Sequence, residues 1–265
     1  MSRRLRLDAE LVRRGLARSR EQAAELIATG RVAVGGQRAA KAASQVAAGA
    51  AITVAEPAGG PEFVSRGGHK LAGALAAFGG PAVAGRRCLD AGASTGGFTD
   101  VLLRSGAAHV VAVDVGYGQL AWSLQSDNRV TVLDRVNIRS LQPDQVAPAP
   151  DLVVADLSFI SLALVIPALV ACAAPGADFL LMVKPQFEVG RERAGGGVVR
   201  DPELRAAAVS AVAAAAGKLG LGVAGVTASP LPGPSGNVEY FLWLRRGAPP
   251  PDESAVRHAI AAGPQ

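Results

Sequence analysis

The sequence contains few cysteines, few aromatic residues and hardly any lysine. Cys88 and Cys172, its two cysteines, lie far apart in apolar surroundings. They lack the spacing of a disulfide framework or a metal site, so we expect buried thiols, a reducing cytoplasm and no bound metal. Only seven Phe, two Trp and two Tyr occur in 265 residues, which disfavours an aromatic platform for stacking bases. Four lysines stand against 23 arginines, so each lysine is an unusual choice of positive charge.

Long apolar runs are also scarce. The N-terminus is rich in arginine and lacks the apolar segment of a signal peptide. Residues 157–177 form the one uncharged stretch long enough to span a membrane, but two serines and two prolines interrupt it and no basic residue anchors its ends. We interpret this stretch as a strand end followed by a buried helix, and expect no stable membrane insertion.

Positive charge is concentrated at the N-terminal end of the chain. The first fifty residues contain ten lysines and arginines against four acids, a net charge of +6, whereas the remaining residues sum to −1. Such a block suits the binding of phosphates, although a solvated charged face would look the same. The candidates for RNA contact are Arg4, Arg6, Arg14, Arg18, Arg20, Arg31 and Arg66.

The N-terminal region predicts a small α+β domain. Asp8 can cap a first helix, and Ser19 with Gln22 forms a capping box for a second helix. Residues 31–38 then predict a β-hairpin, and residues 52–54 could extend its sheet. Two short helices joined to an arginine-rich hairpin resemble the RNA-binding domain of the ribosomal protein S-four type.

Apolar runs alternate with helical stretches from residue 87 onward. This alternation predicts an α/β fold with a mostly parallel sheet covered by helices. The last two runs are separated by a loop rich in proline and glycine, without a helix, so they should pair as an antiparallel hairpin at the sheet edge. The expected strands are residues 88–89, 110–113, 130–133, 152–155, 179–183, 223–226 and 240–244.

The composition therefore suggests four segments. We expect a basic domain at residues 1–56, a linker at 57–64, an α/β domain at 65–248 and a C-terminal tail at 249–265. Within the α/β domain, residues 190–200 carry three arginines and three consecutive glycines. This segment could be a flap over RNA or an ordinary surface loop.

A glycine-rich turn follows the first strand of the expected sheet. Such a turn lets backbone N–H groups approach a ligand at the switch point of the sheet. The dinucleotide pattern GxGxxG is absent, which disfavours nicotinamide and flavin. An acid before the first glycine resembles methyltransferases, in which it faces the methionine part of S-adenosylmethionine. The residues concerned are Asp90, Gly92, Ser94, Thr95, Gly96, Gly97 and Phe98.

Polar residues also follow the next strands. Asp114 ends the second strand, where a carboxylate can accept hydrogen bonds from both hydroxyls of a ribose, and Gln119 lies in the next loop. Asp134 and Asn137 follow the third strand and could contact an adenine amino group, and Asp156 ends the fourth. Any one of them could instead cap a helix, but polar residues at successive strand ends favour a cofactor site.

Lys70, Asp156, Lys184 and Glu239 are the candidate catalytic residues. Asp156 and Lys184 end the fourth and fifth strands, at the edge where open α/β sheets bind ligands. Lys70 lies at a helix start and Glu239 opens the last strand. A ribose 2′-hydroxyl is a poor nucleophile, and a lysine can take its proton only when neutral, a state favoured by burial, a second lysine and a cationic cofactor. The alternative is two surface lysines salt-bridged to two acids.

This order of Lys, Asp, Lys and Glu is similar to that of the FtsJ-like RNA 2′-O-methyltransferases. With the S-four-like domain and the segments SRGGHKL, DAGASTGGFTD, DLSFIS, VKPQFE and NVEYF, residues 3–246 resemble the TlyA family. The resemblance implies a Rossmann-like methyltransferase fold, S-adenosylmethionine as cofactor and 2′-O-methylation of cytidine in ribosomal RNA or ribosomal subunits. It implies Lys184 as the general base and Lys70, Asp156 and Glu239 as its partners. Residues 61–64 depart from the family, in which an Arg and a Trp are more usual.

Two other functions fit parts of the sequence. The TlyA family also carries an older haemolysin label, but a membrane-active protein is disfavoured by the absence of a basic amphipathic helix and of a clean membrane span. An RNA-binding ribosome assembly factor with an inactive methyltransferase domain is disfavoured because all four catalytic positions hold suitable residues.

Overall fold

The computed structural model describes residues 4–17, 19–47, 49–55, 63–190 and 197–264. The chain divides into two compact units, residues 1–62 and residues 63–265. Each unit has its own hydrophobic core. The fold class expected from the sequence, a mostly parallel α/β sheet preceded by a small α+β domain, is confirmed.

The first unit packs two helices against short strands. Strand β2 lies between β3 and β5 and pairs antiparallel with both, as the hairpin pattern predicts. Strand β1 pairs with β4, a pairing that the sequence did not indicate. The elements are β1 Arg4–Arg6, α1 Leu7–Arg13, α2 Arg20–Ala28, β2 Val32–Val34, β3 Gln37–Arg38, β4 Gln45–Ala47 and β5 Ile52–Val54.

The two helices of this unit begin differently. Ser19 caps α2, and its hydroxyl accepts a hydrogen bond from the backbone N–H of Gln22, as predicted. Asp8 is not the cap of α1, which was predicted wrongly, because the helix already begins at Leu7. The Asp8 carboxylate instead accepts hydrogen bonds from the guanidinium groups of Arg6 and Arg20. These bonds hold the pKa of Asp8 well below its usual range, with Arg6 making the largest contribution.

The second unit alternates strands and helices. Its elements are α3 Arg66–Phe78, β6 Arg87–Ala91, α4 Gly97–Arg104, β7 His109–Val113, α5 Trp122–Gln125, β8 Val130–Leu133, η1 Ile138–Ser140, η2 Pro143–Val146, β9 Leu152–Ala155, η3 Leu162–Leu164, α6 Ile166–Cys172, β10 Asp178–Val183, α7 Pro185–Glu188, α8 Pro202–Gly217, β11 Leu221–Ala228, β12 Tyr240–Arg246 and α9 Glu253–Ala262. Every strand expected from residue 87 onward lies within one of these strands.

The strands of the second unit form one seven-stranded sheet in the order β11-β12-β10-β9-β6-β7-β8. Strands β6 to β10 run parallel to one another, whereas β12 pairs antiparallel with both β10 and β11. The predicted hairpin at the sheet edge is therefore present. The chain order changes direction between β6 and β9, which is where an open α/β sheet forms a ligand crevice.

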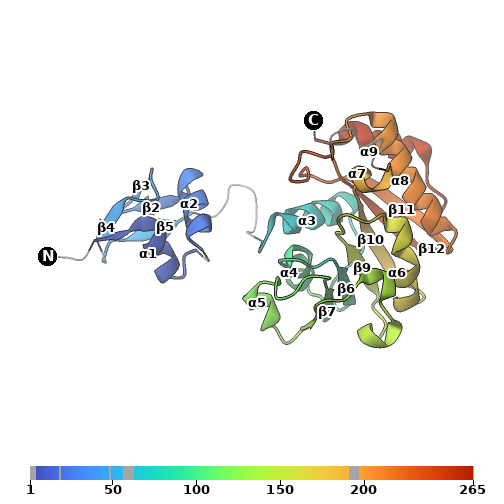
Figure 1. Ribbon diagram of the computed structural model, residues 1–265, viewed down its shortest axis with the longest axis horizontal. Coiled ribbons are helices and arrows are strands. Elements are labelled where there is room, and N and C mark those ends of the chain that lie inside the picture. The colour runs from blue at the N-terminus through green and yellow to red at the C-terminus, as the bar shows by residue number, and fades with distance from the viewer. Residues whose placement is uncertain (1–3, 18, 48, 56–62, 191–196, 265) are drawn as a thin grey trace. The chain divides into compact units, whose positions relative to one another are not determined.

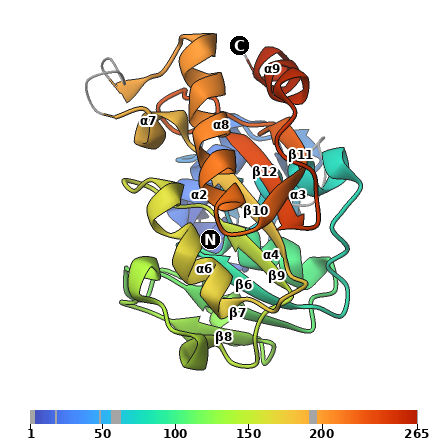
Figure 2. The same ribbon diagram turned by 90° about the vertical axis from the view of Figure 1, so that its right-hand side faces the viewer.

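Helices cover both faces of this sheet (Figure 1). Helices α3, α4 and α5 contribute to the core on one face, and α6, α8 and α9 to the core on the other. Figure 2 shows α6 and α8 in front of the central strands. Because both faces are covered, β9 and β10 are buried along their whole lengths, which explains their continuous apolar sequences.

The C-terminal residues contribute to the second unit. Asp252 caps α9 through its side chain, and Val256, Ala259 and Ile260 point into the core. Residues 253–262, expected as part of a tail, are thus a packed helix. Among the described residues, no helix has the length and apolar character needed to cross a bilayer, and residues 157–177 contain a strand exit, η3 and α6.

Candidate active site

The carboxyl ends of the parallel strands bring the predicted catalytic residues to one edge of the sheet. Asp156 directly follows β9, and its backbone N–H donates to the carbonyl of Ala91 at the end of β6. Strand β10 pairs with β9 and extends two residues beyond that pairing to Lys184. Asp156 and Lys184 therefore lie side by side at the end of the sheet.

Lys184 makes two contacts with neighbouring side chains. Its Nζ lies 2.5 Å from Asp156 Oδ1 and donates to Ser158 Oγ at 3.0 Å. The Lys184 side chain is 10% exposed, compared with 22% for Asp156. An ammonium has three hydrogens, so one donor direction remains beyond these two partners.

Lys70 and Glu239 form a second pair, which links residues 169 positions apart. Lys70 Nζ lies 2.5 Å from Glu239 Oε2, and the two side chains are 7% and 1% exposed. The alternative interpretation of the sequence was that the two lysines lie at the surface and form salt bridges with the two acids. The salt bridges are present, but the side chains that form them are largely buried, and groups that are costly to bury are common at functional sites.

Three adjoining cavities surround these pairs. The turn cavity, about 430 Å³, is lined by Lys70, Asp156, Lys184 and the glycine-rich turn. The Asp114 cavity, about 480 Å³, shares Gly92, Asp156 and Ser158 with it. The Glu239 cavity, about 1010 Å³, is lined by Lys184 and Glu239. Lys184 thus borders both the turn cavity and the Glu239 cavity.

The glycine-rich turn requires glycine at two positions. Gly92 has φ +87°, and a Cβ there would lie 2.6 Å from the backbone oxygen of Asp156. Gly96 has φ +98°, and a Cβ there would meet Leu124 at 2.3 Å. These glycines let the turn pass close to the neighbouring strand end. The other predicted turn residues that line the turn cavity are Ser94, Thr95, Gly97 and Phe98.

Asp90 lies beneath this turn and does not line a cavity wall. Its Oδ2 accepts a hydrogen bond from Thr99 at 2.7 Å, and its buried Oδ1 has no partner among the described residues. Desolvation raises the pKa of Asp90 to about 7, with the Thr99 hydrogen bond opposing the rise. An unpaired buried carboxylate oxygen under a glycine-rich turn fits the ammonium group of the methionine part of S-adenosylmethionine.

We expect Asp90 to make the stability of the second unit depend on pH. Because its pKa is higher in the folded state than the ordinary value of 3.8, the folded protein binds an extra proton between about pH 4 and 7. The free energy of unfolding should therefore fall as pH rises through this window. Asp90→Asn should flatten the fall, measured by denaturant unfolding with tryptophan fluorescence, since both tryptophans lie in the second unit. Equal pH dependence in Asp90→Asn and in a control, Asp144→Asn on the exposed η2, would contradict this prediction.

Asp114 is held in place by backbone donors. Its Oδ2 accepts from Ser94 N at 2.8 Å and its Oδ1 from Gly116 N at 2.6 Å. Asp114, Gln119 and Asn137 all line the Asp114 cavity, as expected for a ribose and adenine site. Asp134 does not line it, and its carboxylate accepts from the N–H of Gly118 instead.

Phe159 is a site residue that the sequence interpretation missed. Its side chain is 91% exposed, its φ is +64°, and it lines both the Asp114 cavity and the Glu239 cavity. A positive φ is unusual for a bulky residue and is often found at functional sites. Counting aromatic residues could not reveal it, although its place three residues after Asp156, which directly follows β9, was a usable signal.

The candidate RNA-binding arginines have different surroundings. Arg4 and Arg6 lie on β1, and Arg6 and Arg20 share Asp8 as an ion-pair partner. Arg14 pairs with Glu10 and donates to the carbonyl of Ala50, and Arg31 donates to that of Ala55. Arg18 lies outside the described residues. Arg66 is exposed and lines the turn cavity.

Comparison with known families gives two matches. The FtsJ-like methyltransferase family matches residues 63–246, and the S4 domain matches residues 5–52. The chain is 62% identical, over the full length of both chains, to the 16S/23S rRNA (cytidine-2′-O)-methyltransferase TlyA of Mycobacterium tuberculosis. It is 35% identical to Hemolysin A of Brachyspira hyodysenteriae, over 89% of this chain and 98% of that one.

A solved structure agrees with this fold. A protein of Streptococcus thermophilus that carries a hemolysin name superposes with a TM-score of 0.75 at 36% sequence identity. The match covers 98% of this chain and 96% of that chain. The similarity thus includes both compact units.

Proposed function

The chain belongs to the FtsJ-like methyltransferase family, within its TlyA group, and from this premise we propose that it methylates a ribose 2′-hydroxyl of cytidine in ribosomal RNA. The observation that carries the proposal is the pair of buried lysine–carboxylate contacts, Lys184 with Asp156 and Lys70 with Glu239, beside the glycine-rich turn. S-adenosylmethionine is the cofactor of this family, and its sulfonium centre supplies the methyl group.

The residues around the turn suit that cofactor. The unpaired Oδ1 of Asp90 can accept from an ammonium, and Asp114 provides a carboxylate at the end of β7 for ribose hydroxyls. Gln119 and Asn137 line the same cavity as Asp114. We assign these residues, together with Gly92, Ser94 and the rest of the turn, to cofactor binding.

Lys184 acts as the general base in this proposal. It borders the turn cavity, on the cofactor side, and the Glu239 cavity, where the RNA nucleotide is received. Lys184 Nζ is placed to take up the proton that the 2′-hydroxyl loses when its oxygen is methylated. Asp156 and Ser158 then stabilise the ammonium that forms, since both already lie within hydrogen-bond distance of Nζ.

Lys70 and Glu239 position the nucleotide from the opposite side. Glu239 directly precedes β12 and lines the Glu239 cavity, while Lys70 pairs with Glu239 from α3. The attraction between the two opposite charges offsets the cost of burying them, so neither side chain needs another ion as a partner. The pair can exchange hydrogen bonds with the ribose hydroxyl and still remain electrically neutral.

The first unit holds the RNA in this proposal. We assign residues 1–56 to an RNA-binding domain, 57–64 to a linker, 65–248 to the methyltransferase domain and 249–265 to a C-terminal segment that includes α9. The net charge of +6 on the first fifty residues supports binding of this domain to RNA phosphates. Ribosomal RNA or ribosomal subunits are then the partners, and the cytoplasm is the site of action.

A methyl-transfer assay tests the function. Unmodified 16S and 23S ribosomal RNA are incubated with full-length protein and labelled S-adenosylmethionine, and the product nucleosides are separated. We expect labelled 2′-O-methylcytidine. A label on a base atom, or no transfer to either RNA, would overturn the proposal.

We expect Phe159 to contact the RNA nucleotide. Its exposed ring borders the cavities of the cofactor and the nucleotide, and stacking a base on an aromatic ring contributes about 1–3 kcal/mol. Phe159→Ala should therefore reduce methyl transfer about tenfold to a hundredfold and leave calorimetric binding of S-adenosylmethionine unchanged. Phe159→Tyr, which keeps the ring, is the control. Equal transfer by the alanine and tyrosine variants would remove Phe159 from the site.

A further inference from the structure

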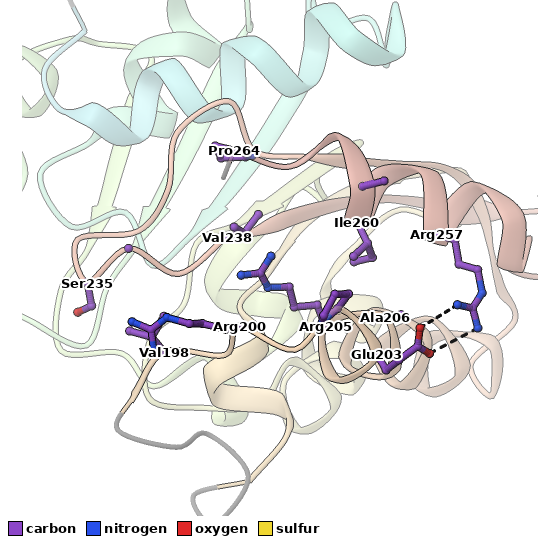
Figure 3. A pocket seen from close by; sticks show the side chains of 13 residues that line it. Val198, Arg200, Glu203, Arg205, Ala206, Ser235, Val238, Arg257, Ile260 and Pro264 are labelled. Atoms are coloured by element: carbon purple, nitrogen blue, oxygen red, sulfur yellow. Dashed lines mark hydrogen bonds and ion pairs between the residues drawn. The ribbon is translucent and has the colours of Figure 1, made fainter.

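A separate cavity of about 550 Å³ lies between α8, α9 and the loop before β12. Its floor is apolar and includes Val238, Ile260 and Pro264. Figure 3 shows the Arg205 side chain extending toward Val238, Arg200 beside Val198, and Arg257 at one end, where it is joined to Glu203. We call this the α8–α9 cavity.

Two of the three arginines in this cavity lack an acidic partner. Arg257 is compensated, because it forms ion pairs with Glu203 and Glu253. Arg205 donates from Nε to the neutral carbonyl of Val199 at 2.8 Å. Arg200 is exposed and has no ion-pair partner among the described residues. The cavity therefore carries uncompensated positive charge beside an apolar floor, which suits the phosphate and the sugar or base of a nucleotide.

The α8–α9 cavity lies next to the Glu239 cavity. Ser235 lines both this cavity and the Glu239 cavity. The two segments that form the shared wall are tied together by Asn237, which accepts from Val199 N at 2.9 Å and donates to the Gly197 carbonyl at 2.7 Å. A strand in the Glu239 cavity therefore lies one shared lining residue, Ser235, away from the cavity that Arg200 and Arg205 line.

We propose that the α8–α9 cavity binds a phosphodiester group of the RNA strand next to the methylated nucleotide, with Arg200 and Arg205 as its ligands. The proposal rests on the function proposed above and adds a second RNA contact, made by the methyltransferase domain itself. Guanidinium groups match phosphate oxygens in a bidentate geometry, and the apolar floor accommodates the flanking nucleoside. The strand is thereby held on the α8–α9 side of the Glu239 cavity.

The test compares two charge-removing substitutions in and near the same helix. Arg200→Ala removes one of the two uncompensated charges of the cavity, and Lys218→Ala removes an exposed charge at the C-terminal end of α8, about 24 Å from its start. Affinity of full-length protein for in vitro transcribed ribosomal RNA is measured across a salt series, without cofactor. We expect Arg200→Ala to weaken binding about tenfold and to lower the salt slope by about 1, with Lys218→Ala like wild type.

The outcomes separate this inference from the function. Equal salt slopes for Arg200→Ala and Lys218→Ala would overturn the inference, even if both variants methylate RNA. A reduced slope only in Arg200→Ala would support it, even if no methyl transfer were found. Cytidine 5′-monophosphate is the probe for a free nucleotide. If this nucleotide binds wild type but not Arg200→Ala, and the salt slope of RNA binding is the same in both, the cavity binds a free nucleotide. That result would also overturn the inference.

Discussion

Lys184→Arg is expected to lose methyl transfer by about 10²–10⁴-fold, the usual effect of removing a positioned acid or base. Arginine keeps the positive charge, so it preserves the attraction to Asp156, but it cannot give up its proton near neutral pH. Binding of S-adenosylmethionine by calorimetry and binding of ribosomal RNA should both stay close to wild type. Single-turnover transfer to unmodified RNA measures the loss.

The exposed Lys218 offers a matched control for this substitution. Lys218→Arg makes the same chemical change far from the catalytic cavities and should transfer methyl groups at the wild-type rate. Near-wild-type turnover by Lys184→Arg would exclude Lys184 as the base. A loss of turnover accompanied by an equal loss of cofactor binding would show a structural defect instead. Lys184 would then no longer be assigned as the general base.

The strands of the second unit could be predicted because burial on both faces leaves a direct mark on the sequence. Strand β9 is buried along its whole length and coincides with the expected residues, because Val, Leu and Ala fill every position. The edge strand β8 is only partly buried and coincides as well, because Val and Thr favour strands. Strands β1 and β4 could not be predicted in this way. Each has three residues, and β1 reads Arg-Leu-Arg, so neither shows an apolar run or sustained alternation.

Helix α9 was missed for a different reason. Asp252 followed by Glu253 is a helix-start signal, and Val256, Ala259 and Ile260 have the spacing of one helix face. Whether such a short amphipathic segment folds depends on the surface it packs against, and that surface is made by α8 and β11, which are distant in sequence.

The sequence indicated the residues of the candidate site, but only one of their two pairings. Strand order at a sheet edge implies that Asp156 and Lys184 are neighbours. Nothing local in the sequence links Lys70 to Glu239, because the contact depends on where the fold places α3 relative to the residue just before β12. The exposure of Phe159 and the loss of Asp134 from the cavity wall are likewise decided by loop conformation, which periodicity does not encode.

Removing one partner of the Lys70–Glu239 pair is expected to destabilise the second unit by about 3–5 kcal/mol, because the other charge is left buried without compensation. Glu239→Leu should show this loss in denaturant unfolding followed by tryptophan fluorescence. The double variant Lys70→Met, Glu239→Leu replaces both charges with apolar groups and should recover most of the stability. It should nevertheless transfer no methyl groups, because the hydrogen-bonding groups facing the ribose are gone.

The double variant therefore separates a structural role from a role in the reaction. If the pair only filled a buried space, a stable apolar replacement would restore turnover together with stability. If the pair positions the ribose, stability returns and turnover does not, while S-adenosylmethionine still binds. Recovery of both properties would contradict the assignment of Lys70 and Glu239 to the active site, and would leave Lys184 and Asp156 to carry the chemistry alone.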